Sequence, residues 1–364
     1  MTGLLQGPLN DPNPKGSIWV YELDKPYDVS PHRLHRLHLD GFPETSDFHP
    51  LGVDILPATR TEPAHVFIVN HGRNYSTVEQ FTLVGRKEAP YHARYVRTWE
   101  HKAIHAPNAI VPLSPTSFYL TNDHRLTRRL PAPVGDIAPL VETLLAIPGG
   151  WVDRLDLVEG EVKVARAISN IPFANGIALS PDGTEVAVVS TTEATVQLYD
   201  RDPATSALTF RERIYIPHSP DNVSYDENKG SILVAGHPHF PSLIKLVAKK
   251  SQTSPSWVIE IERRNVSDGV PVDAEAPYPA YKRVAPTTNY KLTTVYQSNG
   301  LHYSTSATGI RHGKNLLVAG LYGDGLLHCA FLCIPRESTT CSQHLSRQIN
   351  VISVETYSNK CSSP

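Results

Sequence analysis

The chain has 364 residues and a formal net charge of −2. Its aliphatic, aromatic and charged fractions are those of a folded protein with a large core, and the near-neutral balance gives no electrostatic reason to expect nucleic acid or an anionic membrane as a partner. The 31 prolines are spread along the sequence, which favours many short strands and loops over long helices. This length suits one large β-rich domain or two average domains.

A repeated pattern runs along the chain. Each copy has a short start of polar or small residues, then apolar residues, a turn, a hydrophobic strand and a further strand. The clearest copy is "NIPFANGIALSPDGTEVAVVS" (residues 170–190), and the five starts lie near Leu51, Asn108, Asn175, Asn222 and Ala307. Repeats of about 40–50 residues built from strands are typical of a β-propeller, because one blade cannot bury both of its faces. A β-sandwich is the alternative, but it does not require the same start five times.

The starts of the repeats are the candidate site. The first strand of each propeller blade lines the central tunnel, so Asn108, Asn175, Asp221 and Asn222, which come from three blades, are expected to converge on one axis. Amide and carboxylate oxygens suit Ca²⁺, which accepts irregular oxygen coordination. A calcium ion with mostly neutral ligands can polarise a substrate carbonyl. Each asparagine taken alone suits a turn or cap equally well, but their recurrence at one point of the repeat favours a metal site.

Several stretches match one known family in its own order, between about Lys15 and Phe331. They are "VFIVNHGRNYSTVEQF", "SFYLTNDHR", "FANGIALSPDG", "SPDNVSYD", "GHP" (residues 236–238) and "NLLVAGLYGDGLLHCAF". In these motifs the chain resembles the serum paraoxonase/arylesterase family of calcium-dependent lactonases. The resemblance implies an all-β, six-bladed β-propeller with a short helix over one face, which uses Ca²⁺ to hydrolyse a small-molecule lactone or aryl ester. Five starts are visible and the missing one is the first, so the first blade is expected to be incomplete.

The resemblance also implies the metal ligands. The ligands of the family's catalytic calcium fall on Asn108, Asn175, Asp221 and Asn222. The family's second, structural calcium uses an aspartate directly after the first of these, where this chain has Ala109. A second calcium is therefore less well supported than the first.

The same resemblance implies the groups that move protons. His71 in "VNHG" matches one histidine of the pair thought to activate water, and Leu51 occupies the position of the other. His49 lies two residues earlier and would share a face with Leu51 in an extended segment. Asp123 and His124 in "TNDH" match residues that line the family's active site and are the other candidates for proton transfer.

The domain boundaries follow from where the resemblance begins and ends. We expect an N-terminal extension over residues 1–14, a propeller over residues 15–331, and a poorly ordered, polar, Ser-rich tail over residues 332–364. The family's N-terminal acidic calcium ligand has no counterpart before Lys15. All the cysteines lie near the C-terminus, and the sequence does not decide between disulfides and free thiols for Cys329, Cys333, Cys341 and Cys361.

One segment, residues 136–150, has helical apolar spacing, with Asp136 as a plausible N-cap and Gly149 as a stop. A helix near this position in the family covers the tunnel mouth and touches lipid, so residues 136–150 are a candidate for peripheral membrane or lipid contact. The alternative is a helix that packs on the propeller through its apolar stripe.

The remaining signals concern location and rival functions. No transmembrane run or signal peptide is found at Met1, which indicates the cytoplasm, or secretion or the ER lumen if a targeting segment lies upstream. The glycosylation patterns at Asn74 and Asn265 matter only in the secretory pathway. Two other functions remain open: a different reaction in a calcium propeller of the gluconolactonase or strictosidine-synthase-like type, and a binding scaffold whose catalytic groups are decaying, as Ala109 and Leu51 suggest.

Overall fold

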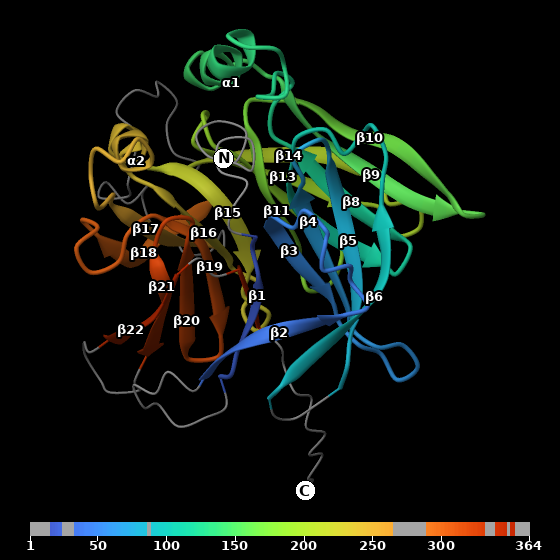
Figure 1. The fold of residues 1–364 in the computed structure, drawn as a ribbon. Helices are drawn as coiled ribbons and strands as arrows, with labels where there is room; N and C mark the ends of the chain where they lie inside the picture. Colours follow the sequence, from blue (N-terminus) through green and yellow to red (C-terminus); the bar gives the residue numbers. More distant parts are fainter. Residues whose placement is uncertain are drawn as a thin grey trace, which may run out of the picture.

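The structure is a computed structural model that describes residues 15–23, 33–85, 89–264, 289–331, 339–347 and 350–353. Strands dominate these residues, and the two helices, α1 (Val134–Leu144) and α2 (Phe240–Val247), lie at the same end of the molecule (Figure 1). In the described part of the chain, no helix has the length and apolar character needed to cross a bilayer.

The strands form blades of four antiparallel strands each, and five such blades follow one another along the chain. The first consists of β3 (Pro50–Leu56), β4 (His65–His71), β5 (Ser76–Leu83) and β6 (Tyr91–Trp99). The second consists of β7 (Pro107–Ser114), β8 (Ser117–Asn122), β9 (Gly150–Val158) and β10 (Glu161–Ile171). The third consists of β11 (Ala174–Leu179), β12 (Glu185–Ser190), β13 (Thr195–Arg201) and β14 (Leu208–Tyr215). The fourth consists of β15 (Ser219–Tyr225), β16 (Ile232–His237), β17 (Ser256–Arg263) and β18 (Tyr290–Ser298). The fifth consists of β19 (Ser306–His312), β20 (Asn315–Gly320), β21 (Asp324–Phe331) and β22 (Thr339–Arg347).

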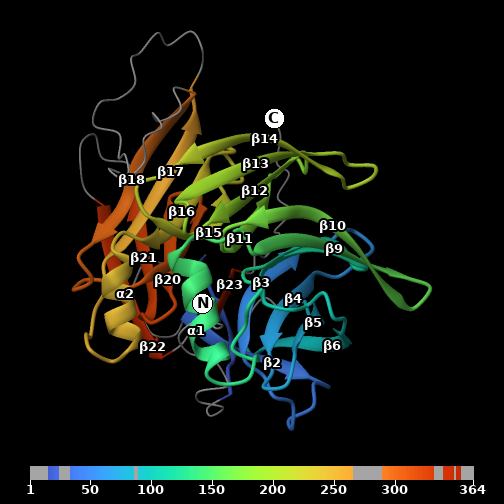
Figure 2. The same cartoon turned by 90° about the horizontal axis from the view of Figure 1, so that it is seen from above.

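The first strands of the blades lie at the centre. Each of β3, β7, β11 and β15 contacts the first strand of the following blade, and the view from above shows β3, β11 and β15 in the middle with β6, β14 and β18 at the periphery (Figure 2). Every predicted repeat start falls in one of these first strands. The prediction of an all-β propeller from the repeats is therefore confirmed.

Three further strands lie between the fifth blade and the first. They are β1 (Ile18–Tyr21), β2 (Leu34–Asp40) and β23 (Asn350–Ser353). They join the first blade through parallel pairing of β2 with β6, which makes one seven-stranded sheet in the order β23-β1-β2-β6-β5-β4-β3. Both β22 and β23 come from residues 332–364, so strand pairing reaches into the stretch that we expected to be a tail. The extension over residues 1–14 lies outside the described residues.

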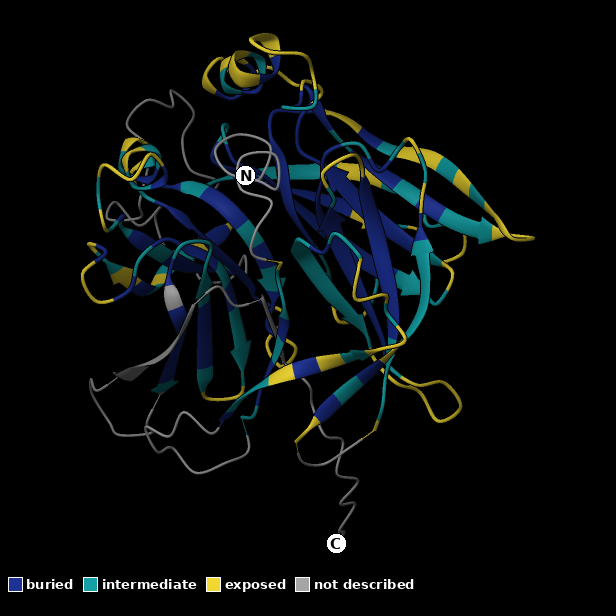
Figure 3. Ribbon diagram, in the orientation of Figure 1, coloured by how far each residue is buried: buried dark blue, intermediate teal, exposed yellow. Residues whose placement is uncertain are grey.

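Apolar clusters hold neighbouring blades together, and β12 shows how the sequence specifies this packing. Val186 and Val188 join the cluster between the second and third blades, and Ala187 and Val189 join the cluster between the third and fourth. Strands buried on both faces read as continuous apolar runs rather than alternating ones, which explains "EVAVVS". Strands β4 and β5, which are buried along most of their length, appear dark blue in Figure 3, and each large side chain buried in this way contributes about 1.5–3 kcal/mol.

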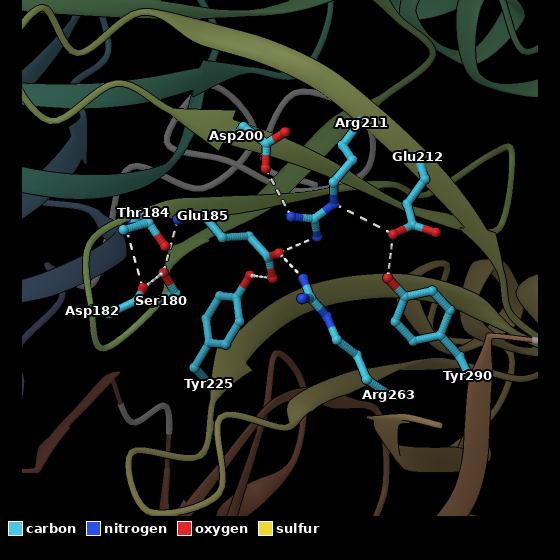
Figure 4. Close-up of polar contacts among 10 residues, drawn as sticks. All are labelled: Ser180, Asp182, Thr184, Glu185, Asp200, Arg211, Glu212, Tyr225, Arg263 and Tyr290. Carbon is cyan, nitrogen blue, oxygen red and sulfur yellow. Dashed lines mark hydrogen bonds and ion pairs between the residues drawn. The ribbon is translucent and has the colours of Figure 1, made fainter. Parts of the chain in front are cut away.

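A charged network joins the third and fourth blades at the end of β12 where Glu185 begins the strand (Figure 4). Arg211 of β14 and Arg263 of β17 both contact Oε2 of Glu185, and the hydroxyl of Tyr225 donates to its Oε1 at 2.7 Å. Arg211 also contacts Asp200 at 2.8 Å. Both carboxylate oxygens of a nearly buried acid are thus paired, which is the condition for tolerating a charge in a protein interior.

Candidate active site

A β-bulge recurs near the start of every first strand. The register of pairing breaks at Pro50/Val53, Pro107/Ile110, Ala174/Ile177, Pro220/Val223 and Ser306/Thr308. A bulge releases residues from the hydrogen-bonded ladder and redirects their side chains, and bulges are common beside active sites. The residues within these five bulges are Leu51 and Gly52, Asn108 and Ala109, Asn175 and Gly176, Asp221 and Asn222, and Ala307. The repeated start in the sequence is therefore a repeated bulge, and every predicted metal ligand lies in one.

The bulges of neighbouring blades touch each other through two glycines. A Cβ added to Gly176 would lie 2.6 Å from Cα of Asn222, and one added to Gly52 would lie 2.2 Å from the carbonyl oxygen of Asn108. Any side chain at these two positions would clash with backbone, so glycine is required for the close approach. In this way Gly176 brings the bulge that contains Asn175 against the bulge that contains Asn222.

The three asparagine amides share one arrangement. Each donates through Nδ2 to a protein oxygen: Asn108 to Oδ2 of Asp123 at 3.2 Å, Asn175 to Oγ1 of Thr191 at 2.9 Å, and Asn222 to the carbonyl of Ala307 at 3.0 Å. Within the described ranges none of the three Oδ1 atoms accepts a hydrogen bond, and that of Asn175 is fully buried. A buried oxygen without a partner costs about 1–3 kcal/mol, so Oδ1 of Asn175 is typical of a group that awaits a ligand.

Asp221 is the one carboxylate among the predicted ligands. It is nearly buried, and its Oδ2 lies 3.1 Å from Nε2 of His237. Tyr322 lies close enough for the charge of Asp221 to act on it: burial first, and then this charge, raise the pKa of the phenol above its ordinary range. His237 and Tyr322 were not predicted as site residues, although both lie in stretches that carry the family resemblance, "GHP" and "LYGDG".

Asp123 and His124 form a buried chain of hydrogen bonds that begins at Asn108. Oδ1 of Asp123 lies 2.9 Å from Nδ1 of His124, whose Nε2 lies 2.7 Å from Oγ1 of Thr143 on α1. Burial acts to raise the pKa of Asp123, but the charge and hydrogen bond of His124 outweigh it and hold that pKa below its usual range. The ring of His124 also contacts Phe173, with centroids 4.5 Å apart. Thr143 had no signal in the sequence that would have identified it.

His71 lies beside this chain. Burial lowers the pKa of its imidazole to about 4, while the charge of Asp123 and a hydrogen bond with the main chain of Pro107 act in the opposite direction. Oγ of Ser76 lies 3.3 Å from its Nδ1. The structure therefore brings His71, Asp123, His124 and Asn108 together, and His71 is neutral at neutral pH.

His49 is held differently. Its Nε2 lies 2.8 Å from Oδ1 of Asp47, whose Oδ2 accepts a hydrogen bond from the main chain of Arg73. Only its backbone approaches the site, through a hydrogen bond from the amide of His71 at 3.0 Å. Leu51 packs against the apolar cluster between the first and second blades. The described contacts do not join the ring of His49 to those of His71 or His124.

Helix α1 covers the site with its polar side. Glu142, which is nearly buried, accepts hydrogen bonds from the amides of Arg125 and Leu126, both at 2.9 Å, and Thr143 reaches His124. Its apolar side chains are exposed: Val134, Ile137, Val141, Leu144 and Leu145 are between 40% and 69% exposed, and much of the helix is coloured as exposed in Figure 3. The alternative of a helix packed on the propeller through its apolar stripe is therefore wrong. The helix also begins at Val134 after Pro133, so Asp136 lies in its first turn and is not the N-cap.

The donor set at the centre consists mainly of amides. No group of three or more His, Cys, Asp and Glu side chains placed to hold a metal occurs in the described ranges. The calcium hypothesis therefore depends on amide oxygens, and Oδ1 of Asn175 is the donor that fits it best because it is buried and has no other partner. Amide oxygens are ordinary calcium ligands, so the residues present fit the ion as part of a coordination shell.

Fold and site together define a β-propeller that carries oxygen donors on bulges around its axis. Residues 8–333 match the model of the arylesterase family, and the chain belongs to that family. Bovine (Bos taurus) serum paraoxonase/arylesterase 2 is 25% identical over 322 residues, which cover 88% of this chain and 77% of the relative. Human (Homo sapiens) serum paraoxonase/lactonase 3 is 27% identical over 308 residues, which cover 84% and 75%. Among solved structures, a periplasmic gluconolactonase of Pseudomonas aeruginosa aligns at 10% identity with a TM-score of 0.48, over 92% of this chain and 86% of the other.

Proposed function

We propose that this protein is a calcium-dependent hydrolase of lactones or aryl esters. Membership of the arylesterase family supports the reaction class. One observation carries the proposal for the site: three amide oxygens and the carboxylate of Asp221 come from bulges at the hub, and the amide oxygens have no hydrogen-bond partner in the described structure.

Asn108, Asn175, Asp221 and Asn222 would hold the ion. The chemistry that bound calcium supplies is polarisation of the ester carbonyl and stabilisation of the charge that develops on its oxygen. The hydrogen bonds donated by the Nδ2 atoms of the three asparagines fix the amides before any ligand binds, so binding requires little ordering of these side chains. Water and substrate oxygens would complete the shell, since calcium takes about six to eight oxygens.

The chain's own groups would handle the proton and the substrate. His71 is neutral at neutral pH and can accept a proton from water. Asp123, held as an anion, orients His124, which is the second candidate for proton transfer. Phe173, Leu243 and Val247 form a buried apolar cluster against which Tyr322 packs. The cluster contacts His124 through the ring of Phe173. It would exclude water from the apolar part of an ester or lactone.

We infer that the ring has six blades, the sixth being the incomplete one formed by β1, β2 and β23. Ile18 and Val20 pack with Val66 of the first blade, and Tyr21 packs with Leu317 of the fifth. The last strand, β23, contacts β3, as the other first strands contact their neighbours. The N-terminal and C-terminal strands together would therefore occupy the position of the missing blade.

Metal analysis and chelation test the function. Purified protein should contain about one calcium ion per chain, and removal of the ion with EGTA should abolish hydrolysis of δ-lactones and phenyl acetate. Added calcium should restore activity, and magnesium should not, because it demands a smaller octahedral site. Hydrolysis that continues unchanged in EGTA contradicts the proposal.

A catalytically impaired scaffold is the second candidate. Leu51, which stands where the resemblance implies a histidine, packs into the apolar core and has no polar group to activate water. Calcium binding without turnover of any lactone, ester or phosphotriester in a broad panel would favour this candidate over the hydrolase.

We also propose that α1 contacts lipid. Its outward apolar side chains surround a hollow of about 360 Å³ lined by Leu126, Pro133, Val134, Ile137, Ala138, Val141, Glu142 and Ile147. Large exposed apolar patches mark interaction surfaces. Neutral phosphatidylcholine vesicles should retain the protein in a flotation assay, and Ile137→Ser with Leu144→Ser should release it. Equal flotation of both forms would contradict lipid contact through α1.

A further inference from the structure

A second hollow lies on the flank of the second blade, away from the bulges at the hub. Its volume is about 680 Å³, and its floor and walls come from the loop after β6, the residue after His124, and the outer strands β9 and β10. Its polar and aromatic lining includes Lys102, His105, Arg125, Trp151, Lys163 and Arg166. No residue assigned to the hydrolytic site lines it.

The back of this hollow is a preformed aromatic and cationic stack. The rings of Trp151 and His105 are stacked with centroids 5.8 Å apart, and the guanidinium of Arg166 lies 4.7 Å from the centre of the Trp151 ring. The buried carboxylate of Asp153 accepts hydrogen bonds from Nε1 of Trp151 at 2.7 Å and from Nε of Arg166 at 2.6 Å. His105 is fixed from its other side, with Nε2 3.0 Å from the carbonyl oxygen of Arg125. These contacts hold the stack rigid.

The charge of the hollow is strongly positive for a chain whose formal net charge is −2. Asp153 is the only acid in the lining, and Arg166 already neutralises it. Lys163 pairs with Glu161, which is highly exposed, so that pair is worth little. Lys102 and Arg125 are exposed, and neither forms an ion pair among the described residues. Clefts lined by charge of one sign concentrate ligands of the opposite sign.

We propose that this hollow binds a small organic anion, a carboxylate or a phosphate monoester attached to an apolar group. Lys102 and Arg125 would hold the anionic group, because arginine offers planar paired donors and lysine a compact charge. Ala103, Val162 and Val164 line the same hollow and would contact the apolar group. A concave site with an apolar wall and a few convergent polar groups is the usual form of a small-molecule site.

Binding is tested on the full chain with phenyl phosphate and benzoate, and with phenol as the uncharged analogue, by isothermal titration in EGTA. EGTA removes calcium, so the proposed ion cannot attract the anion to the hub. Phenyl phosphate or benzoate should saturate at one site per chain, and the preferred ligand identifies the anionic group. The double substitution Lys102→Glu with Arg125→Glu should weaken binding by about tenfold or more.

The control is Arg60→Glu with Lys314→Glu, which makes the same charge change at two exposed positions outside the hollow. It should bind the anions as the natural protein does. The proposal is overturned if neither anion saturates, if phenol binds as tightly as phenyl phosphate, or if both double variants weaken binding equally. Hydrolysis in calcium is measured separately on the same variants, so failure of the proposed enzyme activity leaves this result interpretable.

Discussion

The hairpin of β11 and β12 has one buried polar side chain at each end, Glu185 at the far end and Asn175 at the hub. Their hydrogen bonding differs. At the far end both oxygens of Glu185 are paired, by Arg211, Arg263 and Tyr225 (Figure 4). At the hub end the amide of Asn175 donates to Thr191, but its buried oxygen has no partner in the described structure. Complete pairing holds adjacent blades together, whereas the incomplete pairing leaves a donor available to a ligand at a cost in stability.

The largest effect should come from Asn175→Ala. The loss of this oxygen should lower kcat/KM for the preferred lactone by about two to three orders of magnitude. It should also abolish most of the rise in melting temperature that calcium produces, because a ligand stabilises only the state that binds it. Stability in EGTA should fall by at most about 1 kcal/mol, because the variant loses the hydrogen bond to Oγ1 of Thr191 but also removes a buried oxygen that has no partner.

Asn228→Ala is the matched control, because Asn228 is exposed in the turn between β15 and β16. It should keep both the activity and the response to calcium. If Asn175→Ala unfolds in EGTA but binds calcium normally, then Asn175 stabilises the fold and is not a calcium ligand. Asn175 and Glu185 would then have the same kind of role.

Glu185→Ala should have the reverse effect of Asn175→Ala: a loss of stability without a loss of activity. It removes the acceptor shared by Arg211 and Arg263, and because both arginines remain partly exposed, the free energy of unfolding should fall by about 2–4 kcal/mol. Activity per folded molecule and calcium affinity should not change. Urea unfolding measures the loss, and Asp200→Ala, which removes a 58% exposed partner of Arg211, should cost at most about 0.5 kcal/mol.

A third group, Asp54 on the innermost strand β3, extends the comparison because it has no proposed ligand and no ion pair with any residue that the structure describes. Burial raises the pKa of its carboxyl to about 7, although Oδ1 accepts a hydrogen bond from the amide of Ile55 at 2.8 Å. The folded-state pKa lies above the unfolded value near 4. The contribution of Asp54 to stability should therefore be most favourable below about pH 4, fall as the pH rises towards about 7, and stay level above it.

Asp54→Asn keeps the acceptor and removes the charge. It should increase the free energy of unfolding by about 2 kcal/mol at pH 8, with the difference gone near pH 4. The same substitution at Asp182 should have the opposite effect on stability. Hydrogen bonds from Ser180 and Thr184 lower the pKa of the Asp182 carboxyl, so Asp182→Asn should destabilise the protein at neutral pH. A pH-independent effect of Asp54→Asn would mean that this carboxyl has the same pKa in the folded and unfolded states.

The sequence predicted what depends on local pattern. The starts at Asn108 and Asn175 located the inner strands, and Gly176 indicated a close approach of backbone that the structure confirms. It did not predict that each start is a bulge, because a bulge is defined by the pairing register with a strand further along the chain. The roles of the four metal candidates remain predictions.

Features that depend on tertiary contacts were the ones missed. The apolar spacing of α1 located a helix but not its orientation, since burial of Glu142 against Arg125 and Leu126 reverses the usual arrangement. The strands β22 and β23 lie in a polar stretch without clear alternation, and their backbone pairing with β21 and β1 places them in sheets. The local sequence does not indicate which distant strands or residues a segment will contact.

Thr143→Val should lower activity less than Asn175→Ala does, and it tests whether α1 positions the site or only covers it. The hydroxyl of Thr143 bridges Nε2 of His124 at 2.7 Å and the carbonyl of Pro139 at 3.0 Å. Valine preserves the shape but leaves Nε2 of His124 without this partner, so kcat should fall about tenfold with little change in KM. The acid limb of the pH profile of kcat should also shift, which loss of stability alone would not cause. Thr143→Ser keeps the hydroxyl and should restore both. If valine and serine behave alike, the hydrogen bond to His124 has no catalytic role, and α1 merely covers the ring.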